Sequence, residues 1–210
     1  MSATDRAYDF TKQRVLDSTY AGGHLLTEGE VADALGISRT PVHEAFLRLQ
    51  SDGLLRMYPK RGALVVPVSA QEVEAVMETR LLVERFALDK LLARGAPPRE
   101  ISNALTAAID RQEELAAAGD SDGFVAVDRE FHTIFVTAAS NPIVTGLYDS
   151  LRDRQRRMII TSLLRDERRT ASILVLHRAI AGAIRAGDRE RAQDFLGAHL
   201  RGTLLLLRGG

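Results

Sequence analysis

The chain has 210 residues, of which 45% are hydrophobic and 27% charged, so it is long enough for one large or two small domains with a real core. It contains no cysteine, which excludes disulfides and thiolate metal sites, and its 28 basic and 28 acidic residues balance, which argues against a protein that coats nucleic acid without sequence preference. The polar N-terminus and the lack of any long apolar run predict a cytoplasmic protein with no membrane partner.

Three helices are predicted near the N-terminus. The first covers about residues 5–20. Thr27 is suited to cap a second, short helix that stops at Gly36, where a glycine allows the tight turn that follows. Ser38 then takes the N-cap position of a third helix, and its hydroxyl is expected to accept from a free amide of the first turn. Two helices joined by so tight a turn indicate a helix-turn-helix.

The third helix has one apolar and one polar face. Its inward stripe at helical spacing is Val42, Ala45, Phe46 and Leu49. The polar side chains left facing outward are Arg39, Thr40, His43 and Arg48. Such a set suits a helix that lies in a major groove and contacts phosphates and base edges.

Two strand-like runs follow, at residues 54–57 and 63–67. They are joined by a hairpin tip, residues 58–62, that carries Lys60 and Arg61. Three helices followed by a two-stranded hairpin form the winged helix-turn-helix layout. Residues 1–68 are therefore predicted to be a DNA-binding domain.

Residues 69–210 show helical periodicity, interrupted by glycine, proline and capping residues, and no strand pattern. The predicted helices cover about residues 69–94, 99–118, 120–140, 141–164, 167–186 and 188–207. The predicted fold class is therefore mostly α: a winged helix-turn-helix followed by an all-α bundle of about six helices.

Four potential metal ligands lie in the predicted bundle. Asp128 and His132 are four residues apart, so both side chains project from one face of a helix. His177 and His199 lie on the last two helices at similar distances from the turn between them, which allows them to share one level of the bundle. Three imidazoles and one carboxylate suit zinc, nickel, iron or manganese. The alternative is that these are unrelated, partly buried histidines with ordinary hydrogen-bond partners.

Other polar residues of the bundle have a structural and a functional interpretation. Arg80 and Glu84 form either a solvated surface pair or an inward-facing arginine that binds an anionic ligand. The basic run from Arg152 to Arg157 is expected to be a solvated helix face or an interdomain contact. Asn141, which precedes a proline, is by default a helix cap.

The chain resembles GntR-type transcription regulators in Ile37-Ser38-Arg39-Thr40-Pro41-Val42-His43-Glu44-Ala45, and in Leu49, Gly53-Leu54 and Pro59-Lys60-Arg61-Gly62. The bundle resembles the FCD effector domain of the FadR subfamily. The matching pieces are Arg80 with Glu84, Asp128 with Phe131 and His132, the segment 139–142, the segment 177–180 with Gly187-Asp188, and His199-Leu200. Together the two resemblances span nearly the whole chain.

The resemblance implies a homodimer that binds double-stranded operator DNA of inverted-repeat character as a repressor, under the control of a small metabolite that is often a carboxylate. It implies a divalent metal ion, zinc first and nickel or manganese as alternatives, held by Asp128, His132, His177 and His199. It places effector contacts at Arg80 and Asn141. The implied DNA contacts are Ser38, Arg39, Thr40, His43, Arg48, Lys60, Arg61 and Gly62.

Two positions depart from the family pattern. His43 stands in the reading helix where the family usually has an arginine, and Gly29 stands where many relatives place a DNA-contacting arginine. An arginine is a permanent bidentate donor suited to guanine, whereas a histidine is shorter and can be neutral at pH 7. We therefore predict an altered base preference at His43, or operator binding that strengthens as the pH falls.

Three other functions fit parts of the sequence. Three histidines and an aspartate are able to activate water in a metal-dependent hydrolase, but a hydrolase leaves the DNA-binding part unexplained. A regulator that responds to metal alone, without an organic effector, uses both domains. In the third alternative the pocket has lost its metal and has only a structural role.

Overall fold

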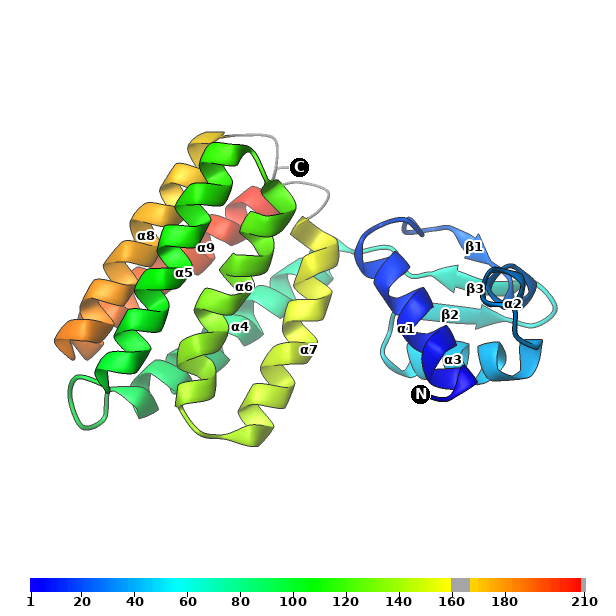
Figure 1. The fold of residues 1–210 in the computed structure, drawn as a ribbon, viewed down its shortest axis with the longest axis horizontal. Helices are drawn as coiled ribbons and strands as arrows, with labels where there is room; N and C mark the ends of the chain where they lie inside the picture. The colour runs from blue at the N-terminus through cyan, green and yellow to red at the C-terminus, as the bar shows by residue number, and fades with distance from the viewer. Residues whose placement is uncertain (160–166, 209–210) are drawn as a thin grey trace. The chain divides into compact units, whose positions relative to one another are not determined.

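The computed structural model describes residues 1–159 and 167–208 and has the predicted fold class, a winged helix-turn-helix followed by a helical bundle (Figure 1). The chain divides into two compact units, Met1–Ser69 and Ala70–Gly210. The predicted end of the fourth bundle helix, near residue 164, lies outside the described residues. No helix within the described ranges is long and apolar enough to cross a bilayer.

The N-terminal unit consists of helices and a small sheet. Its elements are α1 (Ala3–Leu16), β1 (Leu25–Leu26), α2 (Glu28–Leu35), α3 (Arg39–Ser51), β2 (Leu55–Tyr58) and β3 (Gly62–Val65). The strand order is β1-β3-β2, and both pairs are antiparallel. β2 and β3 form the predicted wing. β1 is not predicted, because two residues are too few to show an alternating pattern.

The apolar stripe predicted for α3 forms the core of this unit. Val42, Ala45, Phe46 and Leu49 are all fully buried. They belong to one apolar cluster with residues of α1 and β3, among them Ala7, Leu16 and Val65. This packing fixes the rotation of α3, so its polar face is directed to solvent.

Backbone geometry at three positions frames α3 and the wing. Gly36 ends α2 in the left-handed region, with φ of 62°, as the tight turn requires. Gly62 has φ of 104°, and a Cβ there would lie 2.4 Å from the carbonyl oxygen of Leu26, so this position requires glycine. Ser38 takes the N-cap position of α3, as predicted, but its side chain makes no capping hydrogen bond, so only the expected bond to an amide of the first turn is wrong.

The C-terminal unit is a bundle of long helices, as predicted (Figure 1). Its helices are α4 (Ala70–Leu91), α5 (Arg99–Ala118), α6 (Ser121–Ala138), α7 (Pro142–Ile159), α8 (Glu167–Ala186) and α9 (Arg189–Arg208). Gly187, with φ of 70°, lets α9 turn back along α8, and the two helices pack against each other. α5 and α6 also pack against each other, and α4 packs against α6, α7 and α9.

The bundle core contains charged and polar side chains as well as apolar ones. Phe131 and Phe135 of α6 and Ile180 of α8 are fully buried in it. The buried polar residues include Arg80, Glu84, Gln112, Asp128, His132, Arg152, Gln155, His177 and His199. Because burying a charged or polar group without a partner is costly, this concentration indicates a functional site.

Candidate metal centre and DNA-binding surface

The four predicted metal ligands meet in the interior of the bundle. Asp128 and His132 come from α6, His177 from α8 and His199 from α9. All four side chains are buried, and one possible ligand atom of each lies within 4.8 Å of the other three. The spacing of Asp128 and His132 and the level of the other two histidines therefore place the four groups together, as the sequence predicts.

The separations between these atoms lie on either side of those expected around a bound metal ion. The Nε2 atoms of His132 and His199 are 3.1 Å apart. Asp128 Oδ1 lies 3.5 Å from Nε2 of His177 and 4.0 Å from Nε2 of His132. Four atoms at about 2.0–2.2 Å from one zinc ion in a tetrahedral site are roughly 3.3–3.6 Å apart. The donor set, three imidazole nitrogens and one carboxylate oxygen, also suits such an ion.

Two further side chains orient the imidazoles. Glu84 Oε2 lies 2.8 Å from Nδ1 of His132, and Gln112 Oε1 lies 2.7 Å from Nδ1 of His177. Both oxygens can only accept, so each Nδ1 carries the proton and each Nε2 presents a lone pair. Nε2 of His177 is buried and has no hydrogen-bond partner among the described residues, and a metal ion would satisfy such an atom.

The electrostatics keep His177 and His199 neutral and Asp128 ionised. Burial lowers the pKa of His177 well below its usual range, and burial together with the neighbouring His132 lowers the pKa of His199 to about 3. Burial by itself would raise the pKa of Asp128, but the Arg152 guanidinium holds it well below its usual range. Neutral histidines and an ionised aspartate are the forms that bind metal.

A buried network of charges lies beside the four ligands. Arg152 donates to Asp128 Oδ2 at 2.9 Å and to Gln155 Oε1 at 2.8 Å. Arg80 donates to the same Gln155 oxygen at 2.6 Å and, through Nε, to Glu84 Oε1 at 2.7 Å. The network thus links two arginines to a metal-ligand candidate and to the group that orients another.

This network corrects two expectations. Arg80 and Glu84 are not a solvated pair, because their side chains are only 1% and 0% exposed. The basic run is not a uniformly solvated face either, since Arg152 is 3% exposed and points to Asp128, while Arg154 is half-exposed and pairs with Glu72. The side chains of Arg156 and Arg157 lie outside the described residues.

Three donors at this site have no hydrogen-bond partner among the described residues. They are Nη2 of Arg80, the hydroxyl of Tyr148 and Nε2 of Gln112, and all three are buried. Nη2 of Arg80 lies 2.7 Å from Glu84 Oε1, close enough for an ion pair but without hydrogen-bond geometry. Unpaired buried donors are suited to an anionic ligand.

Several residues of this site escape the sequence analysis. They are Gln112, Tyr148 and Gln155. A signal does exist for Gln112, because it continues the buried stripe of α5 formed by Leu105, Ala108 and Ile109. A polar residue on such a stripe indicates a buried hydrogen-bonding role.

Asn141 has a structural role. Its Oδ1 accepts from the amides of Ile143 and Val144 at 3.2 and 3.3 Å, so it caps the start of α7. The default interpretation as a helix cap therefore holds, and a contact between Asn141 and an effector stays a prediction.

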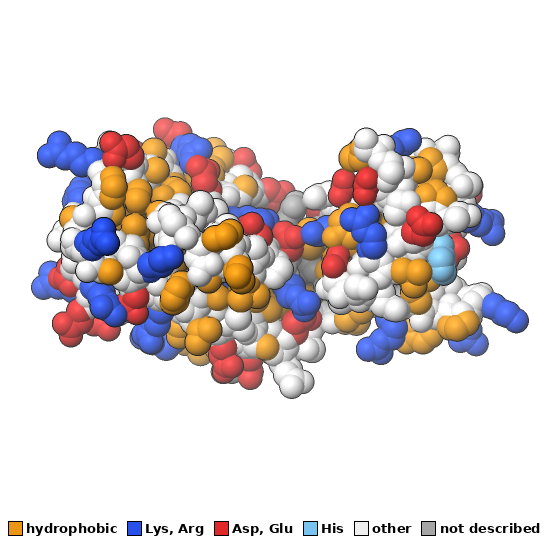
Figure 2. All heavy atoms as spheres, turned by 90° about the horizontal axis from the view of Figure 1, so that it is seen from below, with side chains coloured by type: hydrophobic (Ala, Val, Ile, Leu, Met, Phe, Trp, Pro, Cys, Tyr) orange, Lys and Arg blue, Asp and Glu red, His pale blue; other side chains and the backbone are white. Residues whose placement is uncertain are grey.

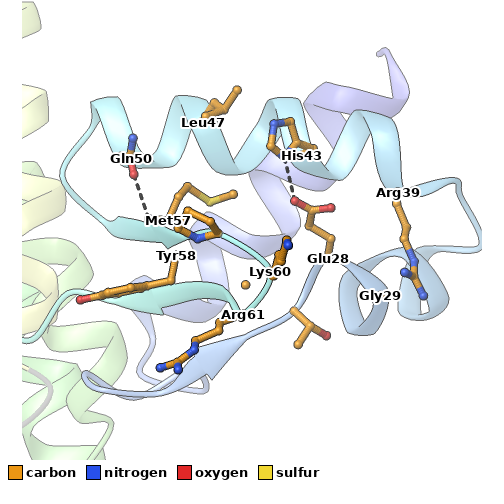
Figure 3. A pocket seen from close by; sticks show the side chains of 13 residues that line it. Glu28, Gly29, Arg39, His43, Leu47, Gln50, Met57, Tyr58, Lys60 and Arg61 are labelled. Atoms are coloured by element: carbon orange, nitrogen blue, oxygen red, sulfur yellow. Dashed lines mark hydrogen bonds and ion pairs between the residues drawn. The ribbon is translucent and has the colours of Figure 1, made fainter.

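The structure has a groove between α3 and the wing, where several of the predicted DNA contacts lie (Figure 3). Of the predicted DNA contacts, the residues that line it are Arg39, His43, Lys60, Arg61 and Gly62. Ser38 and Thr40 are exposed next to it, at the start of α3. Arg48 does not line the groove. Its Nη1 lies 3.0 Å from Asp5 Oδ1, and its guanidinium covers the Tyr8 ring at 4.3 Å.

The two positions that depart from the family pattern have defined surroundings. Nδ1 of His43 lies 2.7 Å from Oε1 of Glu28, the first residue of α2 (Figure 3). The Arg39 guanidinium lies over Gly29, with Nη2 3.4 Å from the place where a Cβ would be. The missing side chain at Gly29 thus gives Arg39 the space to lie beside the start of α2.

Two protein-family models match the chain. The family described as bacterial regulatory proteins, gntR family, matches residues 3–65, and the FCD domain matches residues 75–202. The first match lies within the winged unit and the second within the bundle.

Similar proteins in other organisms are transcriptional regulators. An uncharacterised HTH-type transcriptional regulator of Agrobacterium vitis is 33% identical over 142 residues, which cover 64% of this chain and 79% of the relative. The galactonate operon transcriptional repressor of Escherichia coli is 25% identical over 92% of either chain. The gluconate operon transcriptional repressor of Bacillus subtilis is 24% identical over 75% of this chain and 63% of the relative.

A solved structure shows the same fold. The transcriptional regulator GntR from Rhodococcus sp. RHA1 superposes with a TM-score of 0.83, at 24% identity, over 100% of this chain and 99% of that one. The order of winged helix-turn-helix and bundle is therefore found in an experimentally determined regulator.

Proposed function

Because the chain belongs to the GntR family of bacterial regulatory proteins and carries an FCD domain, it is a transcription regulator, and we propose that a small anionic metabolite bound beside a divalent metal ion controls its operator binding. The observation that carries this proposal is the convergence of four buried ligand atoms next to two buried arginines. A hydrolase finds no support, since the family and the relatives are transcriptional regulators.

For the N-terminal unit, we propose that α3 lies in a major groove of operator DNA. The cations Arg39, Lys60 and Arg61 line one groove with the polar face of α3, so they are positioned to contact phosphates on either side of the bases. Ser38, Thr40 and the backbone at Gly62 lie at the edges of this surface. Arg48, which pairs with Asp5, is assigned to the stability of the unit instead.

For the bundle, we propose a divalent metal ion held by Asp128, His132, His177 and His199, with zinc as the first candidate and nickel or manganese as alternatives. When bound, the ion would supply a positive charge and, at a coordination number above four, a position for a carboxylate oxygen. The protein's own part is to hold the imidazoles in place through Glu84 and Gln112 and to exclude bulk water.

The charges of the site favour an anionic effector. The two guanidinium groups of Arg80 and Arg152 are balanced by the carboxylates of Glu84 and Asp128. A divalent cation would leave this buried group of charges positive overall, and an anion would reduce that excess. Nη2 of Arg80 and the Tyr148 hydroxyl are donors without a hydrogen-bond partner among the described residues, so a carboxylate could engage them, and we propose Arg80 as an effector contact.

The names of two relatives support a repressor that responds to a sugar acid. These relatives act on a gluconate operon and a galactonate operon, and both are called repressors. Gluconate and galactonate each combine a carboxylate with hydroxyl groups, which matches a metal centre next to guanidinium groups. We therefore propose that this chain represses transcription and that a sugar acid or a similar carboxylate is its effector.

We also propose that the protein acts as a homodimer. Four large apolar side chains are exposed on two helices of the bundle, Leu82 and Phe86 on α4 and Ile143 and Leu147 on α7. Figure 2 shows groups of exposed apolar side chains among mixed acidic and basic ones on the visible face of the bundle. Exposed apolar patches of this kind mark protein interfaces, and a dimer would match an operator of inverted-repeat character.

Control of operator binding requires the effector to bind two states of the protein with different affinity. The effector would then shift the dimer between a state whose two reading helices fit the half-sites and one whose helices do not. A metal ion at this centre would contribute to this coupling because it would join three helices. Asp128 and His132 lie on α6, His177 on α8 and His199 on α9.

The proposal is tested by selecting an operator from a pool of random duplexes with the full-length protein. The affinity for the selected duplex is then measured for zinc-loaded protein and for protein treated with a chelator. Each preparation is measured with and without gluconate, galactonate and a set of other hydroxy acids.

An affinity that changes with one of these acids, and only for the zinc-loaded protein, is the expected result. An affinity that follows metal alone across the whole set would instead identify a metal-responsive regulator. Selection of a duplex whose affinity responds to neither metal nor acid would leave the pocket with a structural role only and would refute the proposal.

A further inference from the structure

His43 and Glu28 form a pair at the reading surface, and His43 is the more exposed of the two. It lies in the middle of α3, and its side chain is 51% exposed. Its Nδ1 lies 2.7 Å from Oε1 of Glu28, which comes from a different helix, α2. Figure 3 shows the two side chains facing each other at the edge of the groove. The imidazole is therefore held in one orientation by a group outside its own helix.

The partner determines which nitrogen carries the proton. An ionised carboxylate only accepts hydrogen bonds, so the Nδ1 atom that faces Glu28 must be the protonated one. In the neutral ring, Nε2 then has a lone pair and is an acceptor. The second oxygen of Glu28 is an acceptor as well. The pair therefore presents acceptors, where an arginine would present donors.

The major groove distinguishes acceptors from donors. Guanine shows only acceptors there, N7 and O6, whereas adenine shows an amino donor at N6 and cytosine an amino donor at N4. We infer that His43 and Glu28 form an acceptor pair that selects a base with an exocyclic amino group, adenine or cytosine, and disfavours guanine at the position that His43 contacts. His43 is the specificity-determining residue and Glu28 its positioning residue.

The other charged groups near the pair are suited to different roles. Arg39, Lys60 and Arg61 line the same groove and are donors, so they suit phosphates and guanine. Glu44 follows His43 on α3, but its Oε2 accepts from the Thr4 hydroxyl at 2.8 Å and is directed to α1. Glu44 thus provides a matched control, an exposed carboxylate of the same helix whose partner lies elsewhere.

The inference rests on the proposed docking of α3 in a major groove. Its test distinguishes a failure of the base selection from a failure of the docking. Full-length wild type, Glu28→Ala, His43→Arg and Glu44→Ala proteins each select duplexes from a random pool at pH 8. Wild type and Glu44→Ala are expected to enrich adenine or cytosine at the same position of each half-site. Glu28→Ala, which removes the acceptor that holds the proton on Nδ1, is expected to lose this enrichment there alone, and His43→Arg to replace it by guanine.

Base analogues that lack the major-groove amino group then test its role. In the selected duplex, 2-aminopurine replaces the adenine in question, or 2-pyrimidinone the cytosine, so that the major-groove amino group is absent. The substitution is expected to weaken binding of wild type by at most about 5- to 150-fold, the range for one good base contact. The same substitution should leave the affinity of a His43→Ala protein unchanged.

Two results would overturn the inference while the proposed docking stands. One is enrichment of guanine by the wild type at the position that changes in His43→Arg. The other is an affinity of the wild type that does not respond to removal of the amino group. A wild type that enriches no sequence at all would overturn the proposed docking, and this inference with it.

Discussion

The carboxylate of Glu84 lies 2.8 Å from Nδ1 of His132, and both side chains are fully buried although 48 residues separate them in the chain. Burial by itself would raise the pKa of Glu84, but Arg80 and His132 outweigh it and lower the pKa to about 2. The ionised carboxylate therefore binds a candidate effector residue with one oxygen and a candidate metal ligand with the other. Glu84 is thus the direct physical link between the two parts of the proposed site.

Replacing Glu84 with glutamine should weaken metal binding. The amide removes the negative charge that fixes the proton on Nδ1 of His132 and raises the basicity of Nε2. Loss of such a partner typically lowers metal affinity by about 10- to 100-fold. Competition between the protein and a zinc-binding dye measures the effect, and Glu130→Gln, an exposed glutamate that pairs with Arg111, is the control. An unchanged zinc affinity in Glu84→Gln would contradict the role given to this carboxylate.

Removal of a ligand should abolish stabilisation by metal. A bound ion stabilises the native state by mass action, by about 2.7 kcal/mol when the free ion is at 100 times its dissociation constant. The melting temperature of wild type is therefore expected to rise with added zinc, nickel or manganese, and that of His177→Ala is expected not to respond. His24→Ala, at an exposed histidine of the winged unit, should respond like wild type. A rise of equal size in His177→Ala would show that the ion binds elsewhere.

The sequence predicts the metal ligands better than the rest of their site, for a physical reason. Asp128 and His132 are neighbours on one helix turn, and the short turn at Gly187 sets the relative level of His177 and His199, so local geometry determines both pairs. Local geometry does not predict the partners of Arg80 in the same way. Its contact with Gln155 joins residues 75 positions apart, and only the packing of α4 on α7 brings them together.

Exposure is the other quantity that the sequence does not reveal. Charged side chains such as Arg80 and Arg152 are rarely buried, so a solvated helix face is the natural expectation for both. The structure buries them because each finds a carboxylate, Glu84 or Asp128, on the inside of the bundle. On the winged unit, the sequence likewise does not reveal that Arg48 pairs with Asp5, because this contact depends on how α1 packs on α3.

The metal-free protein should lose stability as the pH falls. The pKa of His199 is lowered from 6.5 to about 3 in the folded state, and that of His177 is lowered as well, mainly by burial. Between these values the unfolded chain binds protons that the native state does not, so acidification from about pH 6.5 toward pH 3 favours unfolding. Each such proton changes the free energy of unfolding by about 1.4 kcal/mol per pH unit.

This pH dependence is measured by urea unfolding of the bundle at several pH values in the presence of a chelator. A His199→Gln protein should show a shallower slope than wild type, since one histidine no longer contributes. His43→Gln, on the exposed reading helix, should leave the slope of the bundle unchanged. A wild-type free energy of unfolding that stays constant from pH 7 to pH 4.5 would contradict the prediction.

Arg39 and Arg48 should differ in their contribution to DNA binding. Arg39 lines the groove, whereas Arg48 is engaged by Asp5 and the Tyr8 ring. Arg39→Ala is expected to lower operator affinity and to reduce the slope of log affinity against log salt by about one, the change for one lost phosphate contact. Arg48→Ala should keep the slope and instead lower the stability of the winged unit by about 1 kcal/mol. Equal salt slopes for the two variants would show that this division of roles is wrong.

The exposed apolar side chains of α4 should hold the dimer together. Leu82 and Phe86 are one helix turn apart and are 71% and 46% exposed, so they present one apolar stripe to solvent in the isolated chain. A double variant with glutamate at both positions places two charges in the proposed interface, where neither has a partner, and should dissociate the dimer. Sedimentation velocity is expected to give about twice the 23.0 kDa chain mass for wild type and the mass of one chain for the variant.

Operator affinity should fall with the dimer, because a single chain can occupy only one half-site. Val175→Glu is the matched control, since Val175 is 61% exposed on α8, away from the proposed patch on α4 and α7. This variant should sediment and bind DNA like wild type. If Val175→Glu dissociates the protein and the α4 variant does not, the interface lies on the α8 face. If neither variant changes the mass of a dimeric wild type, the interface uses neither stripe, and the effector would have to act on the reading helices through another surface.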